Sequence, residues 1–116
     1  MSNHETVDSF LDELAQVLEQ QRDAELERVA RALGMSVRTL QRRLRESGTW
    51  FVRERVKARV RYAQRRMVTN PVMPLSLVAF DAGFSSPAQL TAAFQKVERT
   101  TPSAWRRAFL AEAAKT

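Results

Sequence analysis

Apolar residues recur at helical spacing in two short neighbouring stretches, residues 25–33 and 36–47. The apolar positions of the first stretch are Leu26, Val29, Ala30 and Leu33, and those of the second are Val37, Leu40 and Leu44. Gly34 follows the first stretch, which suits the left-handed residue after a helix end. Ser36 precedes the second stretch and suits an N-cap, whose hydroxyl accepts from an orphan backbone N–H. The pattern predicts a helix-turn-helix motif.

The polar face of the second predicted helix carries side chains that are suited to reading bases. At about 100° per residue, the positions opposite the apolar stripe are Arg38, Gln41, Arg42 and Arg45. Arg can bond both acceptors of guanine, and Gln can bond the donor and the acceptor of adenine. Thr39 and Arg43 flank this face, where we expect them to contact DNA phosphates. The alternative is an ordinary solvated surface, because many helices with an Arg-rich face have no other role.

An amphipathic helix is predicted over residues 6–20, ahead of the motif. Its apolar positions are Val7, Phe10, Leu11, Leu14, Val17 and Leu18, and its outer face is acidic. We expect it to pack against the motif as the first helix of a three-helix unit. Residues 1–5 are polar and are expected to be flexible. They include His4, the single histidine of the chain, for which we expect neither a metal-binding nor a catalytic role.

A long helix is predicted over residues 50–69, with a length of roughly 30 Å at about 1.5 Å per residue. Its apolar stripe is expected to be Val52, Val56, Val60, Ala63 and Met67. Basic residues occupy most of its other positions. Trp50 and Phe51 are expected to plug the core at its start, and Pro71 and Pro74 break the helix at its end.

The first pattern recurs after the proline break, over residues 75–98. The apolar positions are Leu75, Val78, Ala79 and Ala82 in its first helix and Leu90, Ala93, Phe94 and Val97 in its second. Gly83 ends the first of these helices, as a glycine does in the earlier motif. Ser86 and Gln89 form a capping box around Pro87, a residue favoured at the first helical position. Two such motifs in one short chain favour DNA binding more strongly than either motif alone.

A closing helix is expected to begin at Thr101-Pro102 and to turn Trp105, Ala108 and Phe109 inward. The predicted fold is therefore all-α, with seven helices in two helix-turn-helix subdomains joined by a long central helix. The expected division is a flexible N-terminus (1–5), a first subdomain (6–49), a linker helix (50–69) and a second subdomain (70–113). If the linker helix holds the two second helices near ~34 Å apart, both can enter successive major grooves of DNA.

The charge of the chain favours an anionic partner and is unevenly distributed. The 116 residues hold 19 basic and 13 acidic side chains, a net charge of +6. Residues 1–27 hold eight acidic and one basic residue, net −7, and residues 28–116 hold five acidic and eighteen basic, net +13, which together give +6. Such an excess favours nucleic acid or an acidic membrane surface. Sixteen of the nineteen basic residues are Arg, a bias that a GC-rich genome also produces.

Several classes of protein are disfavoured by what the sequence lacks. Without Cys there is no disulfide or thiolate metal site, and no apolar run approaches the ~20 residues of a membrane span. The N-terminus is unlike a signal peptide, so a soluble cytoplasmic protein is expected. With one terminal His and no Gly-rich phosphate loop, we expect neither an enzyme nor a cofactor, and Asp81 suits a surface role or a local cap. The open alternative is a basic helical module that binds RNA or a protein partner.

Four segments in this order resemble the DNA-binding domain of the arabinose-regulator (AraC/XylS) family. They are ALGMSVRTLQRRL (32–44), the long basic helix, AFDAGFSSPAQLTAAF (79–94) and TTPSAWRR (100–107). The resemblance runs from about Thr6 to Phe109. It implies a seven-helix, two-motif domain that binds promoter DNA as an activator or, less often, a repressor, with RNA polymerase as a further partner. It fits a stand-alone regulator or the output half of a larger one, and no small-molecule effector is expected within this chain.

The resemblance also assigns roles residue by residue. In the first motif, the family's base-reading positions are Arg38, Gln41 and Arg42. In the second motif, they are Pro87, Ala88 and Ala92, none of which can donate a side-chain hydrogen bond. The second recognition helix is therefore expected to make mainly backbone or apolar contacts, through Ser86, Pro87, Ala88, Gln89, Ala92, Gln95 and Lys96. Arg106 and Arg107 are expected to hold phosphates. Arg99 stands where the family usually has Gly, so we expect that turn to be remodelled to avoid left-handed strain.

Overall fold

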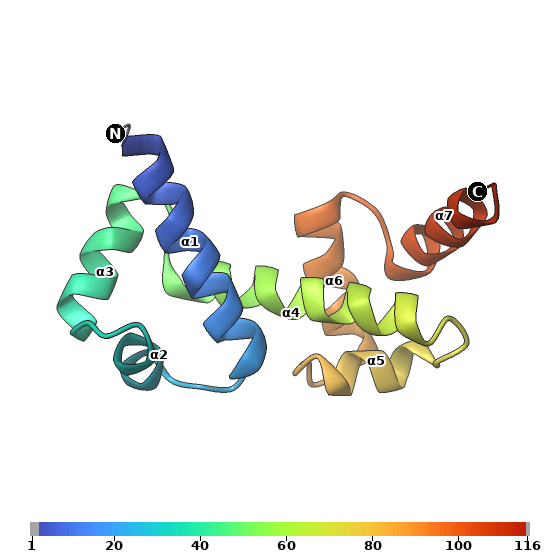
Figure 1. The fold of residues 1–116 in the computed structure, drawn as a ribbon. Helices are drawn as coiled ribbons and strands as arrows, with labels where there is room; N and C mark the ends of the chain where they lie inside the picture. Colours follow the sequence, from blue (N-terminus) through green and yellow to red (C-terminus); the bar gives the residue numbers. More distant parts are fainter. Residues whose placement is uncertain (1–2, 116) are drawn as a thin grey trace. The chain divides into compact units, whose positions relative to one another are not determined.

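The computed structural model describes the backbone of residues 3–115 and side chains from residue 9 to residue 115. Seven α-helices and no strand make up this part of the chain, which confirms the all-α prediction (Figure 1). The helices are α1 (Asn3–Gln20), α2 (Leu26–Ala32), α3 (Val37–Glu46), α4 (Phe51–Thr69), α5 (Leu75–Asp81), α6 (Pro87–Glu98) and α7 (Pro102–Ala114). The first helix thus begins three residues before the predicted start. Met1, Ser2 and the side chains of His4 and Val7 lie outside the described residues.

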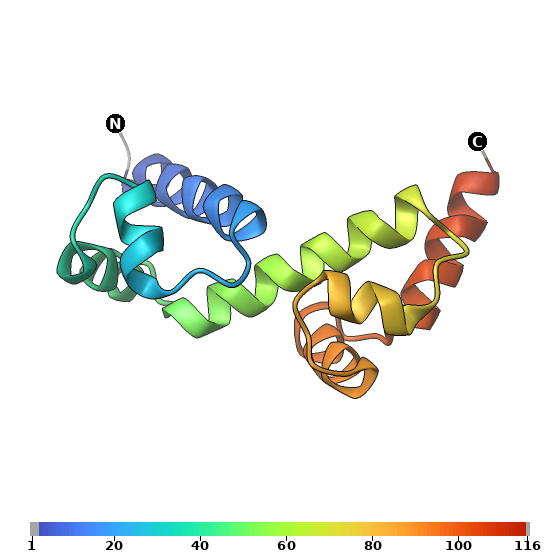
Figure 2. The same cartoon turned by 90° about the horizontal axis from the view of Figure 1, so that it is seen from below.

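The chain forms two compact units, and the N-terminal unit ends at Ala58. In this unit α2 packs against both α1 and α3 (Figure 2). The buried core consists of Phe10, Leu14, Leu18, Ala24, Val29, Ala30, Leu40, Leu44 and Ala58. Most of these residues are the predicted apolar positions of the first helix and of the first motif. Their burial fixes how α3 is rotated about its axis, and thereby which of its side chains reach solvent.

The C-terminal unit begins at Arg59 and contains the rest of α4 with α5, α6 and α7. In it α6 packs against α5 and α7 (Figure 2). The core consists of Val60, Ala63, Met67, Met73, Val78, Ala79, Ala82, Phe84, Leu90 and Phe94. Trp105 of α7 lies at the edge of this core, with its ring centroid 5.9 Å from that of Phe94 in an edge-to-face arrangement. The second motif therefore also buries its predicted apolar face.

The boundary between the units falls within α4, so this helix contributes to both cores. Ala58 is buried in the N-terminal unit, while Val60, two residues later, is buried in the C-terminal unit. The sequence analysis predicted a single apolar stripe along this helix, with Val60 as one of its members. Instead, the buried positions change along α4, because each unit packs against its own part of the helix.

Two residues near the start of α4 lie at the surface, contrary to prediction. Trp50 is 57% exposed and Val52 is 56% exposed. The inward positions here belong to Phe51, which packs against the core, and to Glu54, which is only 7% exposed. The Glu54 carboxylate is compensated because Thr49 Oγ1 donates to Glu54 Oε2 at 2.6 Å and Lys57 Nζ lies 3.6 Å from the same oxygen. The predicted apolar stripe therefore lies on the wrong face of the helix in this first turn.

The outer part of α7 is also more exposed than the sequence predicted. Ala108 is exposed, and Phe109 is exposed over 40% of its surface. Phe109 does not reach the core but stacks on Trp105, with ring centroids 5.5 Å apart. Of the three residues predicted to turn inward, only Trp105 packs against the core.

The ends of the helices follow the local sequence signals closely. Ser36, Ser86 and Thr101 each cap a helix by accepting from a backbone N–H three residues later. Gly83 has a φ of +96°, which is readily available only to glycine, and ends α5 as predicted. Arg99 departs from expectation: the turn after α6 keeps the left-handed conformation, with φ 60° and ψ 27°. The turn is not remodelled, and an Arg occupies a position that favours glycine.

Candidate nucleic-acid interface

The predicted base-reading side chains lie together on the outer face of α3. Leu40 and Leu44 are buried almost completely in the core, and Val37 packs against it from the edge. Burial of this stripe turns the opposite face to solvent, and the residues exposed there are Arg38, Gln41, Arg42 and Arg45. A helix surface with these donors has the width and chemistry to enter a major groove and bond base edges.

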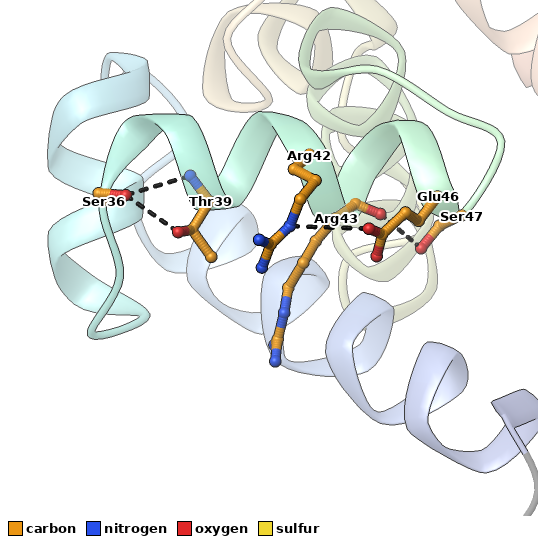
Figure 3. Close-up of polar contacts among 6 residues, drawn as sticks. All are labelled: Ser36, Thr39, Arg42, Arg43, Glu46 and Ser47. Atoms are coloured by element: carbon orange, nitrogen blue, oxygen red, sulfur yellow. Dashed lines mark hydrogen bonds and ion pairs between the residues drawn. The ribbon is translucent and has the colours of Figure 1, made fainter.

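The start of α3 is organised by a pair of hydrogen bonds between Ser36 and Thr39 (Figure 3). Ser36 Oγ accepts from the Thr39 N–H at 3.1 Å and donates to Thr39 Oγ1 at 3.0 Å. Because Thr39 Oγ1 is the acceptor in the second bond, the proton of its own hydroxyl can be donated elsewhere. This arrangement suits the predicted phosphate contact, since hydroxyls and helix N-termini both bind phosphate oxygens.

Arg42 and Arg43 are neighbours in sequence but take different directions (Figure 3). The guanidinium of Arg43 lies over the ring of Phe10 in α1, 5.6 Å from its centroid. The guanidinium of Arg42 stays on the outer face, where its Nε lies 3.6 Å from Oε1 of Glu46. Arg43 is therefore partly engaged in packing α3 against α1, while Arg42 is directed toward solvent.

The N-terminus of α6 is held by the predicted capping box. Ser86 Oγ accepts from the Gln89 N–H at 3.2 Å, and Gln89 Oε1 accepts from the Ser85 N–H at 2.9 Å. The reciprocal bond thus reaches Ser85, one residue before the N-cap. Ser86 and Gln89, which were predicted to contact DNA, therefore also form hydrogen bonds with the backbone at the start of α6.

The outer face of α6 differs chemically from that of α3. Its exposed residues are Pro87, Ala88, Gln89, Ala92, Gln95, Lys96 and Glu98. Within the helix bounds, α6 has one basic and one acidic residue, whereas α3 has four basic residues and one acidic residue. The first turns of α6 thus present methyl groups and a proline ring where α3 presents charged donors.

The two arginines of α7 are not equivalent. Arg106 is half-buried and its Nη1 donates to the backbone carbonyl of Met73 at 2.7 Å. Arg107 is exposed. The predicted phosphate role therefore suits Arg107 better, because the guanidinium of Arg106 already links α7 to the loop before α5.

Comparison with known proteins identifies the family. Residues 29–108 match the family described as "Helix-turn-helix domain". The HTH-type transcriptional regulator GlxA of Rhizobium meliloti (strain 1021) is 33% identical over 107 residues, which is 91% of this chain and 32% of GlxA. The chain belongs to the AraC-type helix-turn-helix family. It spans about a third of the length of this relative.

Solved structures of AraC-type domains share the fold. The DNA-binding domain of AdpA, solved in complex with a target DNA, has a TM-score of 0.70 and 28% identity, with 91% of this chain and 97% of that chain covered. A DNA-binding transcriptional dual regulator from Escherichia coli K-12 has a TM-score of 0.71 at 23% identity, covering 82% of this chain and 86% of its own. The C-terminal domain of AraT, a response regulator from Geobacillus stearothermophilus, has a TM-score of 0.65 at 24% identity, covering 84% of each chain. The predicted family and the predicted fold are both confirmed.

Two further ion pairs in this AraC-type domain were missed by the sequence analysis. Glu46 pairs with Arg42, a contact that the four-residue spacing on one helix could have suggested. Asp81 pairs with Arg66, with Oδ2 3.3 Å from Nη2, and so links α5 to α4. No local spacing indicates this second pair, because the two residues come from different helices.

Neither a metal-binding cluster nor a membrane-spanning helix is found among the described residues. Among the side chains of residues 9–115, no three His, Asp or Glu residues are grouped closely enough to hold a metal ion. In the same part of the chain, no helix is both long and apolar enough to cross a membrane.

Proposed function

We propose that this AraC-type domain binds double-stranded DNA in a sequence-specific manner, with α3 as the principal reading helix. The observation that carries the proposal is the outer face of α3, where the exposed residues are Arg38, Gln41, Arg42 and Arg45. Each of these side chains can make paired hydrogen bonds to the major-groove edge of a purine. The AdpA domain, which shares this fold, was solved with a target DNA.

We further propose that the second motif contributes affinity more than sequence information. The exposed residues in the first turns of α6 include Ala88 and Ala92, which can contact only the methyl group of thymine. Lys96 and Arg107 are exposed cations of the same unit and suit phosphate contacts. Engagement of two successive major grooves, as the sequence analysis expected, stays a prediction, and so do the phosphate contacts of Thr39 and Arg43.

Transcription regulation is the biological role that we propose for this DNA binding. GlxA is named as a transcriptional regulator, and the E. coli neighbour as a dual regulator. Activation, with RNA polymerase as a partner, and a cytoplasmic location remain parts of the proposal that rest on the family alone. An enzymatic activity is not proposed, because the family consists of transcription regulators.

Selection of bound sequences from a random duplex library tests the proposed function. We expect enrichment of an asymmetric motif, with most of its information within one half-site, and a footprint of about two helical turns. No enrichment over random duplexes would contradict sequence-specific reading. Equal binding to a matched single-stranded or double-stranded RNA would favour the RNA-binding alternative, and failure to bind any nucleic acid would favour a protein partner.

A further inference from the structure

We infer that Glu46 is a positioning residue that orients the guanidinium of Arg42 for base reading and keeps it from acting as a phosphate contact. The inference rests on the proposed function of α3. Oε1 of Glu46 lies 3.6 Å from Nε of Arg42, and the two side chains are 64% and 59% exposed (Figure 3). Glu46 is the one acidic residue within the bounds of α3.

The position of Glu46 is unfavourable for the stability of the helix. It occupies the last turn of α3, where unsatisfied backbone carbonyls carry partial negative charge and favour cations. Arg43 and Arg45, in the same turn, follow this preference and Glu46 opposes it. An ion pair between two side chains this exposed contributes little to stability. Stability therefore does not account for a carboxylate at this position.

The position is also unfavourable for general affinity to DNA. A carboxylate beside a reading face repels phosphates and offsets one of the cations that would otherwise attract them. This loss of affinity for DNA is useful to a sequence-specific protein only if the carboxylate improves discrimination between base pairs. Its contact with Arg42 supplies a way for it to do so.

The geometry indicates how Glu46 improves discrimination. A guanidinium offers two pairs of parallel donors, one formed by its two Nη atoms and one formed by Nε with an Nη. The carboxylate lies on the Nε side, so the edge with the two Nη atoms is left for the O6 and N7 acceptors of guanine. Holding the side chain in one direction also reduces the freedom that Arg42 would lose on binding. Because the Glu46 carboxylate partly offsets the charge of Arg42, the guanidinium attracts a nearby phosphate less strongly.

The experiment compares Arg42→Ala, Glu46→Ala and Glu46→Gln with wild type, and uses Glu27→Gln as a control. Glu27 is exposed on α2 in the same unit, so its substitution removes one negative charge without touching Arg42. Fluorescence anisotropy is measured on the selected wild-type duplex, on duplexes changed at the base pair that depends on Arg42, and on a random duplex. Circular dichroism and thermal unfolding confirm that each variant is folded.

We expect Glu46→Ala to bind the random duplex more tightly while losing roughly 2- to 5-fold of the preference at the Arg42 base pair. That loss is a part of the roughly 5- to 150-fold that a bidentate Arg–guanine contact provides. Glu46→Gln should lose less, because a polar side chain of the same length stays beside Nε although its charge is removed. Glu27→Gln should also bind the random duplex slightly more tightly, but with the preference unchanged.

Three results would overturn the inference, and they differ in whether the proposed function survives. If Arg42→Ala lowers the preference and Glu46→Ala leaves it intact, the positioning role is wrong while the proposed function stands. The same holds if Glu46→Ala changes the preference at a different base pair, since Glu46 would then read a base directly. If wild type shows no preference at any base pair, the proposed function fails and the inference fails with it.

Discussion

Arg99 holds a backbone conformation that its side chain disfavours. Its φ of 60° makes it the one non-glycine residue with positive φ in the described part of the chain. For a residue with a Cβ atom, this conformation costs about 1–2 kcal/mol. We expect Arg99→Gly to raise the free energy of unfolding of the C-terminal unit by about 1 kcal/mol, because the greater freedom of glycine in the unfolded chain offsets part of the relief. Chemical denaturation measures this change.

Arg99→Ala serves as the matched control for this substitution. It removes the same charge and the same long side chain but keeps the Cβ atom, so the left-handed strain remains. We expect its stability to stay close to wild type. If Ala stabilises the domain as much as Gly, the gain comes from loss of the Arg side chain, and the strain argument is wrong.

Hydrogen bonds between residues that are close in the sequence could be predicted, whereas contacts with residues far along the chain could not. Ser36 and Ser86 cap helices through bonds three residues away, so the sequence placed them correctly. The hydrogen bond from Arg106 to the carbonyl of Met73 was not predicted, because the two residues lie thirty-three positions apart in the chain. The contact between Arg43 and Phe10 was not predicted for the same reason, since Phe10 belongs to α1.

At the scale of the helices, α4 allows a direct test of which positions are buried. Val60 is completely buried in the C-terminal unit, whereas Val52 on the same helix is 56% exposed. Val60→Asp places a carboxylate among apolar side chains without a partner, which costs several kcal/mol. We expect a large loss in the thermal stability of the C-terminal unit, seen by circular dichroism or calorimetry.

Val52→Asp is the control for Val60→Asp, because the same substitution is made at the surface. We expect it to change the melting temperature little, since exposed substitutions usually lie within about 0.5 kcal/mol. A large fall in the melting temperature of Val52→Asp would mean that the apolar stripe first predicted for this helix is the correct one. An unchanged melting temperature for Val60→Asp would mean that the described core is wrong.

The helix boundaries followed from the sequence more readily than the buried faces did. Ser36 caps the start of α3 and Gly48 follows its end, and Ser86 caps the start of α6, so local chemistry defines these boundaries. In α4 the buried positions shift between Ala58 and Val60 because each unit packs on its own part of the helix. A single apolar stripe drawn along the whole helix therefore failed at Val52.

At the scale of the whole molecule, the uneven charge predicts strongly salt-dependent binding. Residues 28–116 carry five acidic and eighteen basic side chains, net +13. If roughly 5–8 phosphates are neutralised in the complex, log affinity should fall against log salt with a slope of about −5 to −7. Titration of a labelled duplex at several salt concentrations gives this slope. A slope near zero would instead favour a protein partner.

The family and the two-motif fold could be predicted because four sequence segments carry them in order, and the comparisons bear them out. The chemistry of the reading face could also be predicted, since helical spacing alone brings Arg38 and Arg42 to the face opposite Leu40. The orientation of the Arg43 guanidinium could not be predicted, because it depends on Phe10 of another helix, whereas the spacing of Arg42 and Glu46 could have suggested their pair. Helical spacing therefore predicts which hydrogen-bond donors lie on the outer face of α3, and contacts within the folded unit determine how each donor is oriented.

The central claim is that the two motifs contribute unequally, with α3 supplying most of the sequence information. The most direct measurement compares the sites selected from a random duplex library by wild type, Arg42→Ala and Lys96→Ala. Arg42→Ala should lose the preference at one or two base pairs, because a bidentate contact provides roughly 1–3 kcal/mol of discrimination. Lys96→Ala should weaken binding to all sequences about equally and should reduce the slope of log affinity against log salt by about one unit. An unchanged selected site for Arg42→Ala, or equal information under both motifs, would contradict the account.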